Sequence, residues 1–275
     1  MKFSKPLLLN KDAFSKIIDS SFTKQNEPSK AFLFPYKIYK KYYGIKERII
    51  TKNSKKFIQK FFPDVYTAQL ACRQEGGLSG DFQWVRLAEI AKLVKYFKPK
   101  SICEFGCGGS SFIFADLLKD KNRFVSVEES EYWLEKMKSS GGPLVKYIDA
   151  KVGNRVAFEK DGEAVTKCEV QNIHQKEFDL VYVDGPTAIP LNKEEEVLNI
   201  LDPVGRHMPN IDVELMWENK VFPKVIVIDG RRASLRRLIK KSENNYRIYP
   251  KSSYALNKLS VFPVPFLYHS ILVRK

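Results

Sequence analysis

Apolar positions follow two different spacings along the chain from about residue 83 onward. Trp84–Phe97 repeats apolar side chains at helical intervals and is followed by Pro99, which predicts an amphipathic helix. Short, continuously apolar runs lie between such stretches and are typical of strands buried on both faces. The pattern predicts strands at Ser101–Phe105, Phe124–Val127, Leu144–Ile148, Phe178–Val183, Lys224–Ile228, Tyr246–Tyr249 and Tyr268–Val273, and further helices at Ser110–Leu118, Glu131–Lys138 and Ala233–Lys241.

This alternation predicts an α/β fold with a doubly wound, mostly parallel, seven-stranded sheet and helices on both faces. The last two predicted strands follow each other without a long helix between them, so we expect one late strand to be antiparallel. In open α/β sheets, ligands bind beyond the carboxyl ends of the strands. The residues that directly follow each strand are therefore the candidates for a functional site.

The first part of the chain differs in charge and in aromatic content. The protein has 275 residues and a formal net charge of +15, and +10 of that charge falls within residues 1–78. Ala31–Tyr43 interleaves aromatic side chains with lysines. We therefore divide the chain into a basic, aromatic-rich N-terminal extension (1–78), which we expect to form a lid or to select the acceptor, and one domain over 79–275. The surplus of positive charge favours an anionic partner.

Composition and apolar patterning argue against several classes of protein. The chain is 44% hydrophobic and 29% charged, which is typical of a globular protein. It contains no apolar run of about 18 residues, so we expect no membrane-spanning helix. No apolar segment of a secretory signal follows Met1–Asn10. The four cysteines form no CxxC pair, which favours reduced thiols and a cytoplasmic location.

The segment Glu104–Ser111 (EFGCGGSS) follows a predicted strand and begins a helix. Glycines at such a turn allow the backbone to approach a ligand closely, and the first N–H groups of the helix favour an anion. A dinucleotide-binding fingerprint would have glycine at position 111, and Glu104 would repel a pyrophosphate. The segment instead favours a ligand that carries an ammonium group.

Two further predicted strands end in an acid. Glu128 follows Gly108 by 20 residues in SVEES, and this spacing suits a carboxylate that accepts both hydroxyls of a ribose. Asp184 ends FDLVYVD and precedes a Gly-Pro turn. Both acids are predicted to lie at the same edge of the sheet as the glycine-rich segment.

In this order, EFGCGGSS, SVEES and FDLVYVDGP resemble the class I S-adenosylmethionine-dependent methyltransferases. A looser likeness points to the members that methylate sugar hydroxyls, glycans and small metabolites. The resemblance covers residues 79–275, where YRIYP and SILVRK look like the closing hairpin of that fold. It implies a Rossmann-like fold, S-adenosyl-L-methionine as cofactor and methyl transfer as the reaction.

The resemblance also implies roles for individual residues. Glu128 would hold the ribose hydroxyls, and Asp184 would lie near the sulfonium or the acceptor. Asp149 is a candidate for the adenine end. Ser79 could reach the cofactor carboxylate, although it equally suits the start of a helix. The residues implied at the methionine moiety are Glu104, Phe105, Gly106, Cys107, Gly108, Gly109 and Ser110.

Methyl transfer to oxygen requires an oriented acceptor and a group that removes its proton. Asp184, Asp229 and His207 are the candidates, although Asp184 could only cap its turn and His207 could be a surface residue. Asp184 and Asp229 could also hold a divalent metal, but Gly230 stands where the metal-dependent pattern has asparagine. Arg231 and Arg232 could bind an acidic acceptor such as a uronate or phosphate, or belong to a solvated helix face.

Three functions therefore compete. We expect an O-methyltransferase that acts on a sugar or glycan hydroxyl or another small-molecule acceptor. An RNA methyltransferase that uses the basic N-terminal region is the alternative, but Asp184-Gly185-Pro186-Thr187 departs from the N/D-P-P-Y/F motif of adenine methylation. No glutamate follows Glu243, as ribose methylation of the K-D-K-E type would require. A non-catalytic cofactor-binding module is the third possibility, and the intact glycine-rich segment argues against it.

Overall fold

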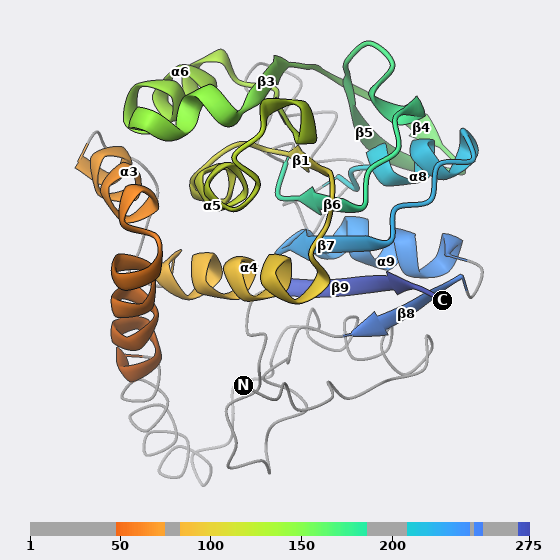
Figure 1. The fold of residues 1–275 in the computed structure, drawn as a ribbon. Helices are drawn as coiled ribbons and strands as arrows, with labels where there is room; N and C mark the ends of the chain where they lie inside the picture. Colours follow the sequence, from red (N-terminus) through yellow and green to blue (C-terminus); the bar gives the residue numbers. More distant parts are fainter. Residues whose placement is uncertain (1–47, 75–82, 186–207, 243–244, 250–268) are drawn as a thin grey trace, which may run out of the picture.

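A mixed seven-stranded sheet forms the centre of the computed structural model, which describes residues 48–74, 83–185, 208–242, 245–249 and 269–275 (Figure 1). The strand order is β3-β2-β1-β6-β7-β9-β8, and β9 runs antiparallel to both of its neighbours. This is the Rossmann-like α/β arrangement that the sequence predicts, including the reversed late strand. The strands are β1 (Ile102–Phe105), β2 (Phe124–Glu128), β3 (Asp149–Val152), β6 (Leu180–Val183), β7 (Val225–Asp229), β8 (Tyr246–Tyr249) and β9 (His269–Arg274).

Helices cover both faces of the sheet because neighbouring strand residues point to opposite sides. Ile102 and Phe124 pack in one core cluster, whereas Cys103 and Val125 pack in the other. The first cluster contains α3 (Pro63–Gln74), α4 (Gln83–Phe97), α5 (Gly109–Leu118) and α6 (Glu131–Ser140), and the second contains α8 (Asp212–Glu218) and α9 (Arg232–Lys241). Short 3₁₀ helices occur at η2 (Lys121–Arg123), η3 (Gly142–Tyr147) and η4 (Ile173–Gln175).

The described end of the predicted N-terminal extension belongs to the first core. Residues 48–61 form a helix that leads into α3, at the left of the sheet in Figure 1. Ile58, Phe62 and Val65 are buried in the same cluster as Trp84 of α4. Residues 1–47 lie outside the described residues, and the function of the extension as a lid or acceptor-selecting segment stays a prediction. No helix within the described ranges is long and apolar enough to cross a membrane.

A β-hairpin that the sequence analysis did not predict lies between β3 and β6. It consists of β4 (Asn154–Lys160) and β5 (Glu163–Glu169), which form a separate two-stranded sheet. Asp161 and Gly162 adopt positive φ angles of 57° and 75° at its turn. Asp-Gly between two alternating runs is a strong hairpin signal, so the sequence did contain the information.

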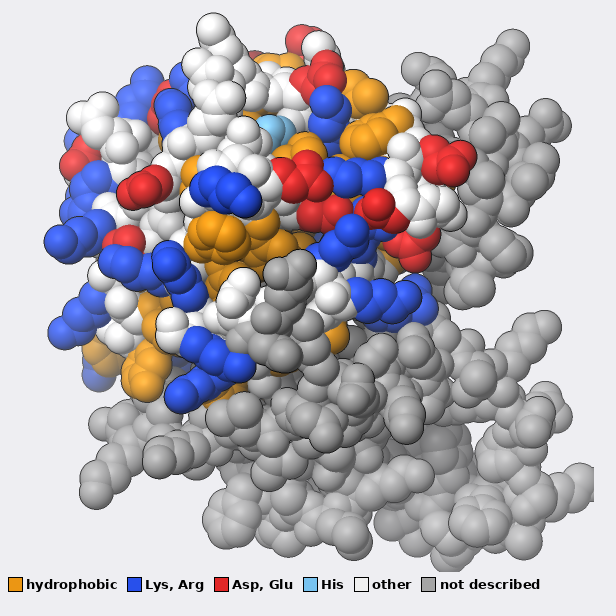
Figure 2. All heavy atoms as spheres, turned by 90° about the vertical axis from the view of Figure 1, so that its right-hand side faces the viewer, with side chains coloured by type: hydrophobic (Ala, Val, Ile, Leu, Met, Phe, Trp, Pro, Cys, Tyr) orange, Lys and Arg blue, Asp and Glu red, His pale blue; other side chains and the backbone are white. Residues whose placement is uncertain are grey.

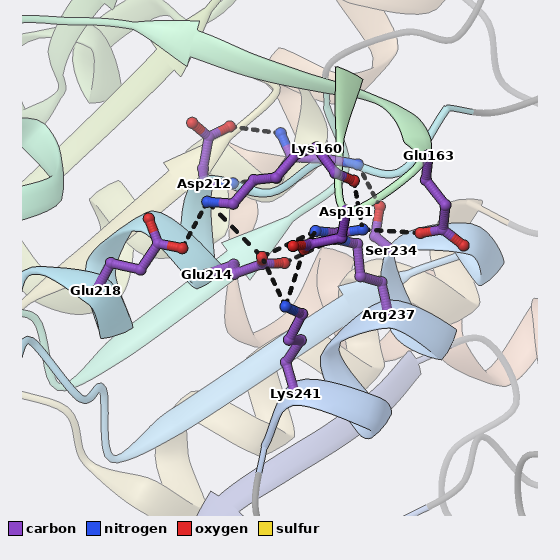
Figure 3. A network of polar contacts seen from close by, with 10 residues as sticks. Lys160, Asp161, Glu163, Asp212, Glu214, Glu218, Ser234, Arg237 and Lys241 are labelled. Carbon is purple, nitrogen blue, oxygen red and sulfur yellow. Dashed lines mark hydrogen bonds and ion pairs between the residues drawn. The ribbon is translucent and has the colours of Figure 1, made fainter. Parts of the chain in front are cut away.

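Polar contacts fasten this hairpin to the helices beneath it (Figure 3). Arg237 of α9 donates from Nε and Nη2 to the two carboxylate oxygens of Glu214 of α8, at 2.7 and 3.0 Å. The same guanidinium reaches Asp161 and Glu163 at the hairpin turn, at 2.6 and 2.8 Å. Acidic and basic side chains accordingly lie next to one another on this face of the molecule (Figure 2). The hairpin, α8 and α9 therefore form one connected unit.

The strand predicted at Leu144–Ile148 is wrong. Residues 142–147 form the 3₁₀ helix η3, and the third strand of the sheet is β3, at Asp149–Val152. Pro143 occupies the start of η3, where its missing N–H group and fixed φ are favourable. Asp149 consequently begins a strand instead of following one. Helix α8 was also not predicted.

Candidate active site

A cavity of about 270 Å³ lies where β1, β2, β6 and β7 end. The loop after β1 and three strand-end acids form part of its wall, and side chains of α3, α4 and α6 complete it. The sequence placed the site at this edge of the sheet, and the cavity is there. Its lining includes Gln69, Cys72, Arg86, Gly106, Cys107, Gly108, Gly109, Ser110, Glu128, Trp133, Lys136, Met137, Tyr182, Asp184, Asp229 and Arg231.

The loops that follow β1 and β6 touch each other through their backbones. Gly106 has a φ of 95°, and a Cβ atom there would overlap with the backbone of Gly185. The N–H groups of Asp184 and Gly185 both donate to the carbonyl of Phe105, at 2.9 and 2.6 Å. Gly108 differs, because a Cβ atom there would meet nothing within 4 Å. Gly106 is thus needed for packing, whereas Gly108 leaves backbone open toward the cavity.

Glu104 lies behind the cavity wall and is fully buried. Its carboxyl group accepts hydrogen bonds from the hydroxyls of Ser110, Ser111 and Ser126. Burial raises its pKa to about 8, although the three hydroxyl donors oppose the shift. Glu104 therefore joins β1 to the start of α5 and to β2. Its predicted contact with an ammonium group stays a prediction, as does the role of Phe105, which is buried beside it.

Glu128 lines the cavity and connects two loops. Its Oε2 accepts from the backbone N–H of Cys107 at 2.8 Å, and its Oε1 accepts from that of Ser130 at 3.0 Å. The side chain is buried at the end of β2. Each carboxylate oxygen has a second lone pair, so the acid can still accept hydroxyl donors from a ligand.

Asp184 and Asp229 follow and end neighbouring parallel strands. Val183 pairs with Ile228, so the two acids lie beside each other. Asp229 Oδ2 accepts from the hydroxyl of Tyr182 at 2.9 Å and lies 3.3 Å from Nη1 of Arg86. The catalytic role that the sequence predicts for these two acids stays a prediction. Tyr182 and Arg86 were not predicted as part of the site.

A buried histidine extends the charged cluster to the other side of Asp229. His269 Nε2 lies 3.6 Å from Asp229 Oδ2, and His269 Nδ1 lies 2.7 Å from Glu89 Oε2. His269 is fully buried and is not among the site residues that the sequence predicts. Only the antiparallel pairing of β9 with β7 brings His269 opposite Asp229, so sequence position alone could not reveal the contact.

The two neighbouring acids have opposite pKa shifts. Burial and the adjacent Asp229 raise the pKa of Asp184 to about 7. Burial alone would also raise the pKa of Asp229, but His269, Arg86 and the Tyr182 hydroxyl lower it to about 2. His269 in turn has a pKa of about 9 because Asp229 and Glu89 outweigh its own burial. One acid is therefore ionised at neutral pH while the other titrates there.

Arg231 is already bound to the loop after β6. Its Nε donates to the backbone carbonyl of Asp184 at 2.7 Å, and its Nη2 lies 3.7 Å from Oδ1 of the same residue. Arg231 thus holds Asp184 in place. Arg232 begins α9, and its side chain lies outside the described structure. The binding of an acidic acceptor by these arginines stays a prediction.

Other predicted site residues lie elsewhere. Ser79 and His207 fall outside the described residues. Asp149 forms an ion pair with Lys151 at 3.1 Å and does not line the cavity. Within the described ranges, no group of three or more His, Cys, Asp or Glu side chains could hold a metal ion.

Several residues that line the cavity carry no recognisable signal in the sequence. Gln69 and Cys72 come from α3, and Trp133, Lys136 and Met137 come from α6. Their positions depend on how these helices pack over α5 and the sheet, and helix packing is a tertiary effect that no local motif encodes. Cys107 does belong to the predicted motif. Its burial raises the pKa of its thiol, and the negative charge of the nearby Glu128 raises it further.

Sheet topology and the cavity at the strand ends define a Rossmann-like α/β domain. No protein-family model and no curated protein sequence matches the chain. Similar solved structures include a methyltransferase from Podospora anserina with bound S-adenosylhomocysteine. It is 12% identical to this chain, the alignment covers 99% of this chain and 100% of that chain, and the TM-score is 0.40.

Two O-methyltransferases are also similar. TomG from Streptomyces achromogenes, in complex with S-adenosylmethionine, has 12% identity over 80% of this chain and 95% of that chain, with a TM-score of 0.43. An O-methyltransferase from Bacillus cereus in complex with S-adenosylhomocysteine has 13% identity over 80% and 96%, with a TM-score of 0.46. Likeness at this level leaves the function to be argued from the residues of the site.

Proposed function

We propose that this protein is an S-adenosylmethionine-dependent methyltransferase that methylates a hydroxyl of a small acceptor, with a sugar or glycan as the favoured class. The observation that carries the proposal is that three features line the same cavity. These are the open backbone at Gly108, the carboxylate of Glu128, and Asp184 with its raised pKa.

The described residues fit this cofactor. The space beside Gly108, which a Cβ atom would fill, admits a ligand close to the backbone at the start of α5. Glu128 faces the cavity with lone pairs for the two ribose hydroxyls. S-adenosylmethionine, when bound, supplies a methyl group on a sulfonium.

Asp184 is the proposed general base. A group whose pKa lies near the working pH is the most effective at removing a proton, and the pKa of Asp184 is about 7. The guanidinium of Arg231 on the Asp184 carbonyl fixes the loop that carries this acid. The side chain can therefore accept the proton of an acceptor hydroxyl that enters the cavity beside it.

Asp229 is the proposed anchor for the acceptor. Its side chain is 2% exposed, and its Oδ1 has no hydrogen-bond partner among the described residues. Because the carboxyl group is held ionised, Oδ1 would accept a hydrogen bond from a second hydroxyl of the acceptor. Both cavity guanidiniums, those of Arg86 and Arg231, already contact these acids. This arrangement supports a neutral polyhydroxyl acceptor over an anionic one.

Calorimetry with S-adenosylhomocysteine tests the cofactor part of the proposal. We expect the wild-type protein to bind this ligand and the Glu128→Ala variant to lose binding. Glu135→Ala is the matched control, because Glu135 is an exposed glutamate on α6, with a side chain that is 69% exposed. Absence of binding to the wild-type protein would refute the proposal.

A transfer assay with methyl-labelled cofactor tests the acceptor part. Glycans, nucleotide sugars, small phenols and RNA are offered in parallel. We expect label to enter a sugar hydroxyl. Transfer to RNA alone would contradict the acceptor class and would instead support the basic N-terminal region as a nucleic-acid contact.

A further inference from the structure

Helix α3 contributes to the cavity a polar side chain that no motif predicts. Gln69 is 5% exposed and lines the cavity, although it lies outside the segment that resembles methyltransferases. Its Oε1 is buried, and the described residues offer it no hydrogen-bond partner. A buried amide oxygen without a partner is unfavourable and is rare in native proteins, so an unpaired one at a cavity wall indicates a donor supplied by a ligand.

The position of Gln69 identifies the part of the cavity that it faces. A Cβ atom at Gly109 would overlap with Gln69 Oε1 and lie 3.2 Å from Cδ2 of Leu87. Because α5 begins at Gly109, the amide oxygen lies at the N-terminus of this helix and beside the open backbone at Gly108. Gly109 is therefore required for the close approach of Gln69.

The backbone of α3 is fixed by packing, so Gln69 is held in this position. Val65 and Ala68 lie on the same helix and are buried in the core cluster that contains Trp84. The ring of Tyr66 lies 5.2 Å from that of Trp84. A side chain on so well packed a helix loses little further freedom when a ligand binds.

We propose that Gln69 binds the amino-acid end of S-adenosylmethionine, with Oε1 accepting a hydrogen bond from the ammonium group. This inference rests on the proposed function and deepens it. The N–H groups of Cys107 and Gly108 already donate to Glu128 and Ser111, so a ligand carboxylate is expected at the N–H groups of the first helical turn that follows. This leaves the ammonium group to pair with an acceptor such as Oε1. Helix α3 is then a wall of the cofactor site, and the site extends beyond residues 79–275.

Calorimetry with two ligands tests this contact. S-adenosylhomocysteine carries the amino-acid end, and 5′-methylthioadenosine lacks it. Gln69→Met preserves the size of the side chain and removes the oxygen, so we expect it to weaken S-adenosylhomocysteine binding by about tenfold and leave 5′-methylthioadenosine binding unchanged. Gln69→Glu keeps an oxygen acceptor and is expected to bind both ligands as the wild type does. Gln59→Ala, at an exposed glutamine on the preceding helix, is the control.

Each alternative outcome overturns the inference. Unchanged S-adenosylhomocysteine affinity in Gln69→Met would show that the oxygen makes no contact. Equal weakening of both ligands would show that Gln69 acts by supporting the fold, and Gln69→Ala, compared by thermal unfolding, provides a second variant for that comparison. Loss of binding in Gln69→Glu would show that the amide donates to a carboxylate. Failure of the wild-type protein to bind either ligand is a separate result and refutes the proposed function itself.

Discussion

Two adjacent carboxyl groups have opposite pKa shifts because their cationic neighbours lie at different distances. The side chain of Asp229 is 2% exposed and lies 3.3 Å from Arg86, whereas that of Asp184 is 39% exposed and lies 3.7 Å from Arg231. Asp229 lies next to His269 and Arg86, and Asp184 lies next to Asp229 itself. An ionised neighbour makes the second ionisation costly, so the proton remains on Asp184 up to about pH 7. The difference between the acids arises from their partners, which lie on α4 and β9.

The first prediction concerns Asp184→Asn. We expect methyl transfer to fall by a factor of about 10² to 10⁴, which is the usual contribution of a general base, while affinity for S-adenosylhomocysteine stays close to that of the wild type. In the wild type, the rate should rise with pH through about 7, because the base acts only when it is deprotonated. Initial rates between pH 5.5 and 8.5 test this. A variant with wild-type rates would exclude Asp184 as the base.

The second prediction concerns Glu104, whose pKa is about 8 in the folded protein against a usual value of 4.5. Between these values the folded state binds a proton that the unfolded state has released, so stability falls as pH rises. Glu104→Gln removes this contribution. We expect the free energy of unfolding in urea to decline less between pH 5 and pH 8 in the variant than in the wild type. Asp184 and His269 titrate in both proteins and cancel in the comparison, and Glu135→Gln is the exposed control.

Two loops act together at the scale of elements, because the turns after β1 and β6 meet backbone to backbone. This contact explains why glycine stands at both Gly106 and Gly185. The neighbouring Gly108 makes no such contact. Gly106 and Gly108 belong to one motif but have different functions, since the first allows two loops to pack and the second leaves space in the cavity. The motif alone does not reveal this difference.

The third prediction compares Gly106→Ala with Gly108→Ala. The first places a side chain at positive φ and against the Gly185 backbone, so we expect a loss of about 1–3 kcal/mol in unfolding free energy. The second is expected to change stability by less than about 0.5 kcal/mol, yet to weaken S-adenosylhomocysteine binding, because its methyl group enters the cavity. Urea unfolding and calorimetry measure both effects. Equal stability losses would contradict the assignment.

The sequence predicted elements well where a buried strand has a regular apolar run. It failed at Leu144–Ile148, because an apolar run beside Gly141-Gly142-Pro143 is equally compatible with a 3₁₀ turn. It located the acids at the strand ends, since parallel strands bring their carboxyl ends to one edge. It could not find Gln69, Arg86 or His269, because their positions depend on packing between distant parts of the chain.

At the scale of the whole molecule, the helices at residues 48–74 and the sheet share one core. Phe62 and Ile58 are at most 1% exposed and pack in the cluster that includes Trp84, Phe112 and Tyr182. We therefore expect these helices and the sheet to unfold in a single transition. The boundary at residue 78, drawn from charge and aromatic content, stays a prediction, and the described residues on both sides of it pack in one core cluster.

The fourth prediction uses adjacent phenylalanines. Phe62 is 1% exposed and Phe61 is 52% exposed. Phe62→Ala is expected to lower the free energy of unfolding of the entire domain by about 3–5 kcal/mol, because it leaves a cavity in the shared core. Phe61→Ala should change it by less than about 1 kcal/mol. Urea unfolding followed by tryptophan fluorescence distinguishes them, and a biphasic transition would indicate an independent N-terminal unit.

The described residues that flank positions 186–207 are held to the domain by hydrogen bonds on both sides. Gly185 donates to Phe105 at one end. At the other, the Pro209 carbonyl accepts from Thr166 at 2.9 Å and the Asn210 N–H donates to Ser234 at 2.8 Å. The framework on either side of this stretch is therefore joined to three separate elements, β1 through Phe105, β5 through Thr166 and α9 through Ser234.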